Sequence, residues 1–120
     1  MNRKYRLRKT ETIKRVRRLG KSFAHPLIVL SKHPNSDNIT RFGIIARKSI
    51  GLAVKRNQKK RQLREILREA YPSTKPGWDI IILLRRPSRD ATYLELKAAV
   101  KSLLVRADLS KVFDAKGNRS

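Results

Sequence analysis

The stretch IGLAVKRNQKKRQLREILREA, residues 50–70, decides the fold of this chain. Its apolar residues recur at helical spacing: Leu63, Ile66, Leu67 and Ala70. At 100° per residue, and with Asn57 taken as zero, they lie between about 180° and 280° around a helix. The spacing therefore predicts a helix from Ala53 to Tyr71 that packs its apolar side on the rest of the protein.

The cations of this predicted helix gather on its other side. Four of them lie within about 60° of Asn57: Lys60, Arg61, Arg64 and Arg68. Only Glu65 and Glu69 interleave, so ion pairs along the helix cannot neutralise most of the cations. Arginine offers a planar fork to phosphate, and the amide of Asn57 can both donate and accept. We therefore predict that this side of the helix binds a polyanion.

The net charge of the whole chain also indicates a polyanionic partner. It has 31 Lys and Arg residues against 9 Asp and Glu in 120 residues, a net charge of +22. A compact domain with this charge repels itself, so a polyanionic partner is the natural explanation. The length is that of a single domain, residues 1–120, in which we expect a basic arm at 1–9 and a polar tail at 110–120 to be mobile.

The composition argues against several other classes of protein. The chain has no cysteine, which removes disulfides, zinc knuckles and thiol nucleophiles and fits the reducing cytoplasm. The longest apolar runs, Pro26–Leu30 and Ile80–Leu84, are five residues, far short of a membrane span. Residues 1–21 are basic like a transit peptide, but they also fit a folded helix, so we expect a cytoplasmic protein.

The remaining elements follow from turn and capping signals. Thr10 is the expected N-cap of a short helix that ends at Gly20, with Ile13 and Val16 among its apolar residues. Strands are predicted at residues 23–31, 41–48 and 78–85, and a capping box at 92–95 opens a last helix. A helix separates the last two strands, so they could be parallel. The order predicts an α+β or mixed α/β fold with helices on a small sheet.

The residues alone give no sign of protein-based catalysis. Histidine is a common general acid or base, but neither of the two histidines, His25 and His33, has an evident partner in the sequence. The acids are scattered, without a local metal-binding pattern or a Gly-rich phosphate loop. Charge does not separate RNA from DNA. A structural RNA-binding protein, such as a ribosomal component, and a DNA-compacting protein therefore stay open as alternatives.

Residues 41–69, RFGIIARKSIGLAVKRNQKKRQLREILRE, resemble the central signature of the bacterial ribonuclease P protein family. The matching residues are Arg41, Gly43, Lys48, Ile50, Gly51, Ala53, Val54, Arg56, Asn57, Lys60, Arg61 and Arg64. The resemblance extends outward to residues 6–9 (RLRK), 79–87 (DIIILLRRP) and 92–93 (TY), so it covers nearly the whole chain except the tail.

The resemblance implies a fold and an activity. The fold would be an αβββαβα two-layer sandwich, whose four-stranded sheet has a left-handed βαβ crossover. The partners would be the catalytic RNA of ribonuclease P and precursor tRNA. The reaction would be Mg²⁺-dependent endonucleolytic removal of the 5′ leader, with the chemistry carried by the RNA and the Mg²⁺ bound mainly through it. The protein would bind the leader in a cleft between the first helix and the sheet.

The resemblance also assigns residues to the two ligands. The catalytic RNA would contact Lys48, Arg56, Asn57, Lys60, Arg61, Arg64 and Arg68. The leader would contact Ile13, Arg17, Phe42 and Arg47. The chain departs from the family at Gln58, where the signature has an arginine, and at Ile13, Arg17 and Ser31, where aromatic residues are common. We therefore expect aliphatic and cationic contacts to the leader in place of ring stacking.

Overall fold

The computed structural model describes residues 5–111. Its helices are α1 (Thr10–Leu19), α2 (Ala53–Ala70) and α3 (Tyr93–Arg106), and its strands are β1 (Lys21–Ala24), β2 (Ile28–Pro34), β3 (Arg41–Ala46) and β4 (Trp78–Leu84). Three short 3-10 turns connect them: η2 (Lys48–Ile50), η3 (Tyr71–Ser73) and η4 (Arg86–Asp90). The expected order αβββαβα is confirmed.

The four strands form one mixed sheet in the order β1-β2-β4-β3. β3 and β4 are parallel, as predicted for strands separated by a helix, and the other neighbours are antiparallel. The single strand predicted at 23–31 is wrong. His25 and Pro26 interrupt it, and the backbone N–H of Leu27 donates to His25 Nδ1 over 3.0 Å, which closes a hairpin between β1 and β2.

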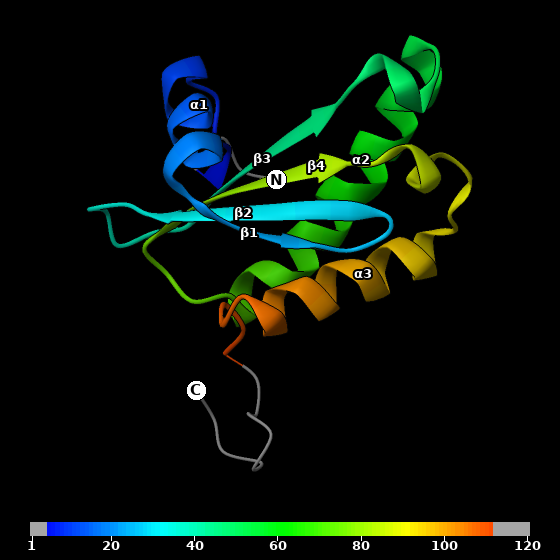
Figure 1. Ribbon diagram of the computed structural model, residues 1–120. Helices are drawn as coiled ribbons and strands as arrows, with labels where there is room; N and C mark the ends of the chain where they lie inside the picture. The colour runs from blue at the N-terminus through cyan, green and yellow to red at the C-terminus, as the bar shows by residue number, and fades with distance from the viewer. Residues whose placement is uncertain (1–4, 112–120) are drawn as a thin grey trace.

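Two helices cover one side of the sheet. Figure 1 shows α2 and α3 on this side and α1 on the other. The inward residues of α2, Leu63 and Leu67, are fully buried here against Ile80 and Ile82 of β4 and Leu103 of α3. Seventeen buried residues make up this core. Burial of this much apolar surface is the main stabilising contribution to the fold.

The other side of the sheet carries a much smaller cluster. Leu7, Val16 and Ile81 are buried there, with Ile13 and Ile45 packed against them. Val16, one of the apolar residues of the first predicted helix, faces the sheet with an exposure of 0%. Gly43 makes the close packing possible: a Cβ at this position would lie 2.8 Å from Ile81 Cδ1 and 3.3 Å from Leu7 Cβ.

The described parts of the predicted basic arm and polar tail contact the rest of the domain, and their mobility stays a prediction. The N–H of Leu7 donates to the Phe42 carbonyl over 2.7 Å, and the ring of Tyr5 lies 4.3 Å from that of Tyr71. At the other end, the N–H of Lys111 donates to the Ser73 carbonyl over 2.6 Å. Residues 1–4 of the arm and 112–120 of the tail lie outside the described residues.

The helix ends follow local chemistry. The capping box before α3 is confirmed, because Thr92 Oγ1 accepts from the Glu95 N–H and Glu95 Oε1 accepts from the Thr92 N–H. These hydrogen bonds to Thr92 hold the pKa of Glu95 below its usual value. α1 differs from expectation by one residue, since Lys9 is its N-cap. None of the helices in residues 5–111 is long and apolar enough to cross a membrane.

Candidate RNA-binding interface

Helix α2 presents two chemically different sides. Leu63, Ile66 and Leu67 are at most 2% exposed, which confirms the predicted apolar side. The residues predicted to face outward do so: Asn57, Arg61 and Arg68 are exposed, and Lys60 and Arg64 are half-buried. The core contacts therefore fix the position of the backbone that carries these cations, which is what recognition of a defined phosphate geometry requires.

The most crowded cations of α2 lie beside the N-terminal arm. Arg6 and Arg8 of the arm and Lys60 and Arg64 of α2 line one small cavity of about 110 Å³. Partial burial lowers the pKa of Arg64, and the nearby charges of Arg6 and Arg61 lower it further. The repulsion between like charges this close decreases when an anion binds between them.

The other residues on and near α2 that are predicted to contact RNA differ in their exposure and in the partners they already have. Lys48 lies exposed in η2, next to the tight turn in which Gly51 has a φ of 131°, a conformation that favours glycine. Arg56 is half-buried at the edge of the apolar side. Arg68 forms an ion pair with Glu65 at 2.5 Å, so it must leave this partner or share it to contact RNA.

One cation of the signature stretch has a structural role. Lys59 is 3% exposed, and its ammonium donates to the Ala91 carbonyl over 2.6 Å and to Gln62 Oε1 over 3.2 Å. Burial lowers the pKa of Lys59. The side chain thus ties α2 to the segment between η4 and α3. The helical wheel carried this signal, because Lys59 falls about 200° from Asn57, among the apolar residues.

The face of the sheet on α1's side carries three of the predicted leader contacts. Val29, Leu83 and Ile45 are cross-strand neighbours there and form a half-buried aliphatic strip. Ile13 of α1 packs beside Ile45, and Arg17, one turn further along α1, is exposed. Arg47 follows Ile45 by two residues and is also exposed. The structure therefore brings Ile13, Arg17 and Arg47 to the same face.

Phe42 is not available as a leader contact. It belongs to the core on the opposite side of the sheet, is 3% exposed and packs edge-on against Tyr71 with ring centroids 6.1 Å apart. Its neighbours Arg41 and Gly43 point to α1's side, because successive residues of a strand alternate. Ser31 is 8% exposed, and its hydroxyl lies 2.8 Å from that of Ser22, so it offers little to a base.

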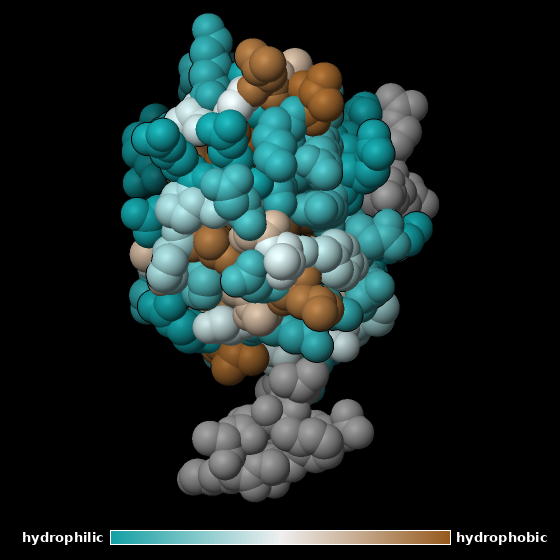
Figure 2. Space-filling view, turned by 90° about the vertical axis from the view of Figure 1, so that its right-hand side faces the viewer, coloured by the Kyte–Doolittle hydropathy of each residue, from teal (hydrophilic) through white to brown (hydrophobic). Residues whose placement is uncertain are grey.

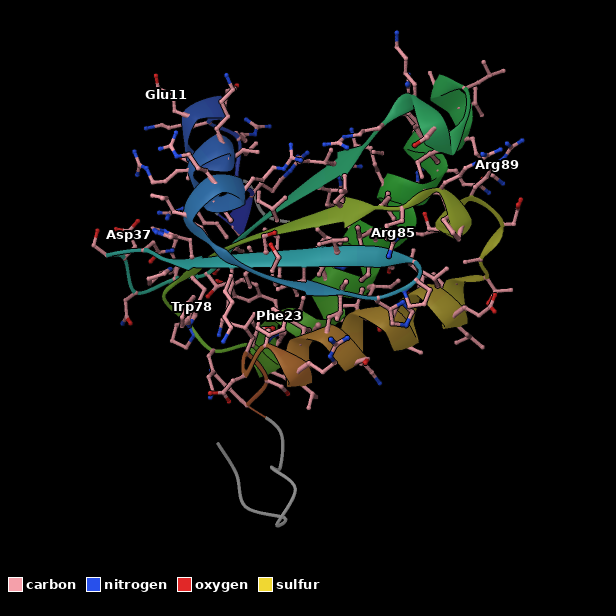
Figure 3. The ribbon with its side chains drawn as sticks, viewed as in Figure 1. Glu11, Phe23, Asp37, Trp78, Arg85 and Arg89 are labelled. Atoms are coloured by element: carbon pink, nitrogen blue, oxygen red, sulfur yellow. The ribbon has the colours of Figure 1, made fainter. Side chains whose placement is uncertain are left out.

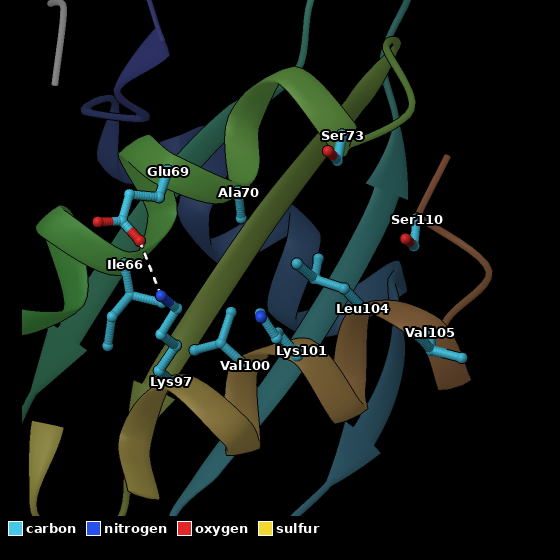
Figure 4. A pocket seen from close by; sticks show the side chains of 10 residues that line it. All are labelled: Ile66, Glu69, Ala70, Ser73, Lys97, Val100, Lys101, Leu104, Val105 and Ser110. Carbon is cyan, nitrogen blue, oxygen red and sulfur yellow. Dashed lines mark ion pairs between the residues drawn. The ribbon is translucent and has the colours of Figure 1, made fainter. Parts of the chain in front are cut away.

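The structure shows no catalytic constellation in residues 5–111. His25 accepts a hydrogen bond in the β1–β2 turn, and His33 is half-buried in β2. In this part of the chain no three His, Cys, Asp or Glu side chains gather as metal ligands. An apolar groove of about 380 Å³ lies between α2 and α3, on the apolar side of α2, and contains the Glu69–Lys97 ion pair at 3.0 Å (Figure 4).

The face of the molecule drawn in Figure 2 is mostly hydrophilic, with apolar side chains at a few places. Figure 2 faces the end that carries the start of α2, where Leu52 and Val54 are 84% and 82% exposed. A rigid helix that holds cations outward on a small basic domain is typical of proteins that bind a phosphate backbone. The fold and the interface thus define the class: a nucleic-acid-binding protein.

Comparison with known proteins gives the family. The family Ribonuclease P matches residues 1–108. The ribonuclease P protein component of Herpetosiphon aurantiacus is 45% identical over 109 residues, which cover 91% of this chain and 89% of that protein. The Staphylococcus aureus RNase P protein superposes with a TM-score of 0.83 at 30% identity, covering 88% of this chain and 97% of that one. For the Thermotoga maritima protein the TM-score is 0.78 at 27% identity, covering 84% and 96%.

The chain therefore belongs to the ribonuclease P protein family, whose members are subunits of an endoribonuclease that processes tRNA. This result supports the interpretation drawn from the signature at residues 41–69 and not the ribosomal alternative.

Proposed function

We propose that the outward side of α2 binds the catalytic RNA of ribonuclease P. One observation carries the proposal: Asn57, Lys60, Arg61 and Arg64 share one side of a helix whose opposite side is buried. The exposed Lys48 and the half-buried Arg56 flank this side, and Arg68 extends it once released from Glu65. These groups contact phosphates and 2′-hydroxyls, which gives affinity and orientation without reading base sequence.

The 5′ leader of precursor tRNA lies along the aliphatic strip on the other face. Arg17 and Arg47 bind its phosphates, while Ile13 and the strip contact sugar and base surfaces. No aromatic ring faces this strip among the described residues, since Phe42 is buried on the far side of the sheet. Leader binding therefore depends on backbone charge more than on base stacking.

The hydrolytic step belongs to the RNA. Mg²⁺, bound mainly through the RNA, would supply the charge stabilisation that phosphodiester cleavage needs. The protein holds the catalytic RNA by one face and the leader by the other, so the scissile bond is positioned with less loss of entropy in the reaction itself. Because the proposed substrate is precursor tRNA, we propose a cytoplasmic location.

Reconstitution tests this function. The protein is mixed with a bacterial ribonuclease P RNA at a Mg²⁺ concentration at which the RNA alone cleaves precursor tRNA slowly. We expect the leader to be released faster in the presence of the protein. If roughly six phosphates are neutralised, the logarithm of the RNA affinity should fall with the logarithm of the salt concentration at a slope of about −4 to −5. An unchanged cleavage rate, with binding to ribosomal RNA or to duplex DNA of equal strength, would contradict the proposal.

A further inference from the structure

Helix α1 divides the face of the sheet on which it lies. The row of Ile81 and Gly43 runs beneath α1 and the arm. The aliphatic strip lies on one side of this row, and the cross-strand neighbours His33, Asp79 and Arg41 lie on the other. Figure 3 shows Asp37 and Arg85 at opposite ends of the sheet with α1 between them.

A polar pocket of about 440 Å³ opens on the Asp37 side of α1. Its walls come from the arm, the first turns of α1, the β2–β3 loop and the ends of β3 and β4. Five cations line it: Arg6, Arg8, Lys9, Arg15 and Arg41. Two acids do so as well, Asp37 and Asp79. This pocket contains none of the residues that the family resemblance assigned to RNA or leader.

The two acids of the pocket are already engaged. Arg41 lies 2.6 Å from Asp37 and 3.8 Å from Asp79, and Asn35 Nδ2 donates to Asp79 over 3.0 Å. Asp79 is also 7% exposed. By contrast, none of the ion pairs within residues 5–111 involves Arg6, Arg8, Lys9 or Arg15. Four cations that line this cavity therefore form no ion pair within the described residues, and both acids of the cavity pair with Arg41.

The pocket is continuous with the cationic side of α2. Arg6 and Arg8 line both this pocket and the smaller cavity that contains Lys60 and Arg64. The cations of the arm thus extend around the edge of β3, from the side of the sheet that α1 covers to the side that α2 covers. It is held in place by the hydrogen bond from Leu7 to Phe42 and by burial of the Leu7 side chain.

We propose that Arg6, Arg8, Lys9 and Arg15 form a second phosphate-binding site, which takes backbone phosphodiesters of the catalytic RNA. The assignment rests on the proposed function of α2. An RNA strand bound to Lys60 and Arg64 reaches this site along the arm without crossing the protein. The leader strip is separated from it by α1, so the precursor's leader is not its ligand. Phosphate contacts of this kind add affinity and salt dependence but no sequence preference.

The test measures binding of the full-length protein to a bacterial ribonuclease P RNA over a series of salt concentrations. The variant is Arg8→Ala with Arg15→Ala. The matched control is Arg18→Ala with Arg89→Ala, which removes two exposed arginines that line neither this pocket nor the α2 cavity. Circular dichroism and the unfolding midpoint establish that both proteins fold. Each variant is also assayed for its preference for precursor over mature tRNA.

We expect the Arg8/Arg15 variant to bind the RNA about tenfold more weakly, with a salt slope shallower by about 1.5, because two phosphate contacts are lost. The Lys versions of both positions should restore most of the slope, and the control should keep it. Slopes equal in variant and control would overturn the inference. A lost preference for precursor tRNA with unchanged RNA affinity would also overturn it, by assigning the pocket to the leader. If the unmodified protein fails to bind the RNA, the proposed function itself fails.

Discussion

The two sides of the sheet are covered very differently. Seventeen buried residues fill the layer under α2 and α3, whereas three buried residues lie between the sheet, α1 and the arm. The thick layer supplies the stability of the domain and a fixed base for the cations of α2. The thin layer leaves an aliphatic strip and a charged pocket open. Because the core is concentrated on the other side, the sheet face on α1's side is left with the surfaces that we propose for the leader and for RNA phosphates.

Neighbouring isoleucines of β4 give the largest expected contrast. Ile82 points into the thick layer and Ile81 into the thin one, and both are at most 1% exposed. We expect Ile82→Ala to lower the free energy of unfolding by about 4 kcal/mol and Ile81→Ala by about 2 kcal/mol, because α1 can settle into the smaller void. Urea denaturation measures both. Equal losses would show that the two layers are equally rigid.

The next contrast separates binding from stability. Replacing Arg61 and Arg64 by Ala removes two charged contacts from the outward side of α2. We expect RNA affinity to fall by about ten- to a hundredfold, since hydrogen bonds to charged groups are strong, while the free energy of unfolding changes by less than about 0.5 kcal/mol. Filter binding and chemical denaturation test this. Equal losses in the free energy of unfolding and in the free energy of RNA binding would contradict the separation of α2 into a side that binds RNA and a side that stabilises the fold.

Two adjacent lysines test the same separation between stability and RNA binding. Lys59→Ala leaves the Ala91 carbonyl without its donor, and we expect a loss of about 1–3 kcal/mol in the free energy of unfolding with an unchanged salt slope of RNA binding. Lys60→Ala should do the opposite: the slope becomes shallower by about 0.7–0.9 and the stability is kept. The same two assays apply. Equivalent behaviour of the two variants would mean that Lys59 does not have the structural role assigned to it.

The smallest effect concerns the leader. Arg17→Ala should reduce the preference for precursor over mature tRNA by about two- to fivefold, the size expected for one exposed charge. Arg17→Phe should restore part of the preference at high salt, where a stacked ring is less screened than a charge. Arg18→Ala, one residue further along α1, is the control. A preference unaffected by Arg17→Ala would place the leader path elsewhere on the sheet.

Local periodicity predicted α2 well because a helix is regular over its whole length. The buried positions of Leu63, Ile66 and Leu67 follow from spacing alone, and so does the outward side around Asn57. Lys59 lies at about 200° on the same wheel, among the apolar residues, although its charge is typical of a solvated residue. A buried lysine needs a partner, and its partner, Ala91, is distant in sequence. Spacing does not reveal such a contact.

Long-range contacts explain the other failures. The sequence did not predict where the arm docks, because its charge is typical of a tail. Leu7 packs against Gly43, whose missing side chain leaves space for it. Phe42 was assigned to the leader although alternation along β3 gives only two possible faces. The sequence could not decide between them without the pairing of β3 and β4. The β1–β2 hairpin was missed because apolar residues continue on both sides of His25 and Pro26.

The docking of the arm has a further consequence for the chain as it is made. β3 has a single strand partner, β4, which follows it by more than thirty residues. An uncovered strand edge is a template for pairing with another chain. Residues 5–7 are synthesised before β3 and lie against its outer edge in the finished fold. The arm therefore also covers the edge of β3 and prevents this strand from pairing with another chain. A chain that began after Lys9 would be less soluble and would lack the phosphate-binding residues of the arm.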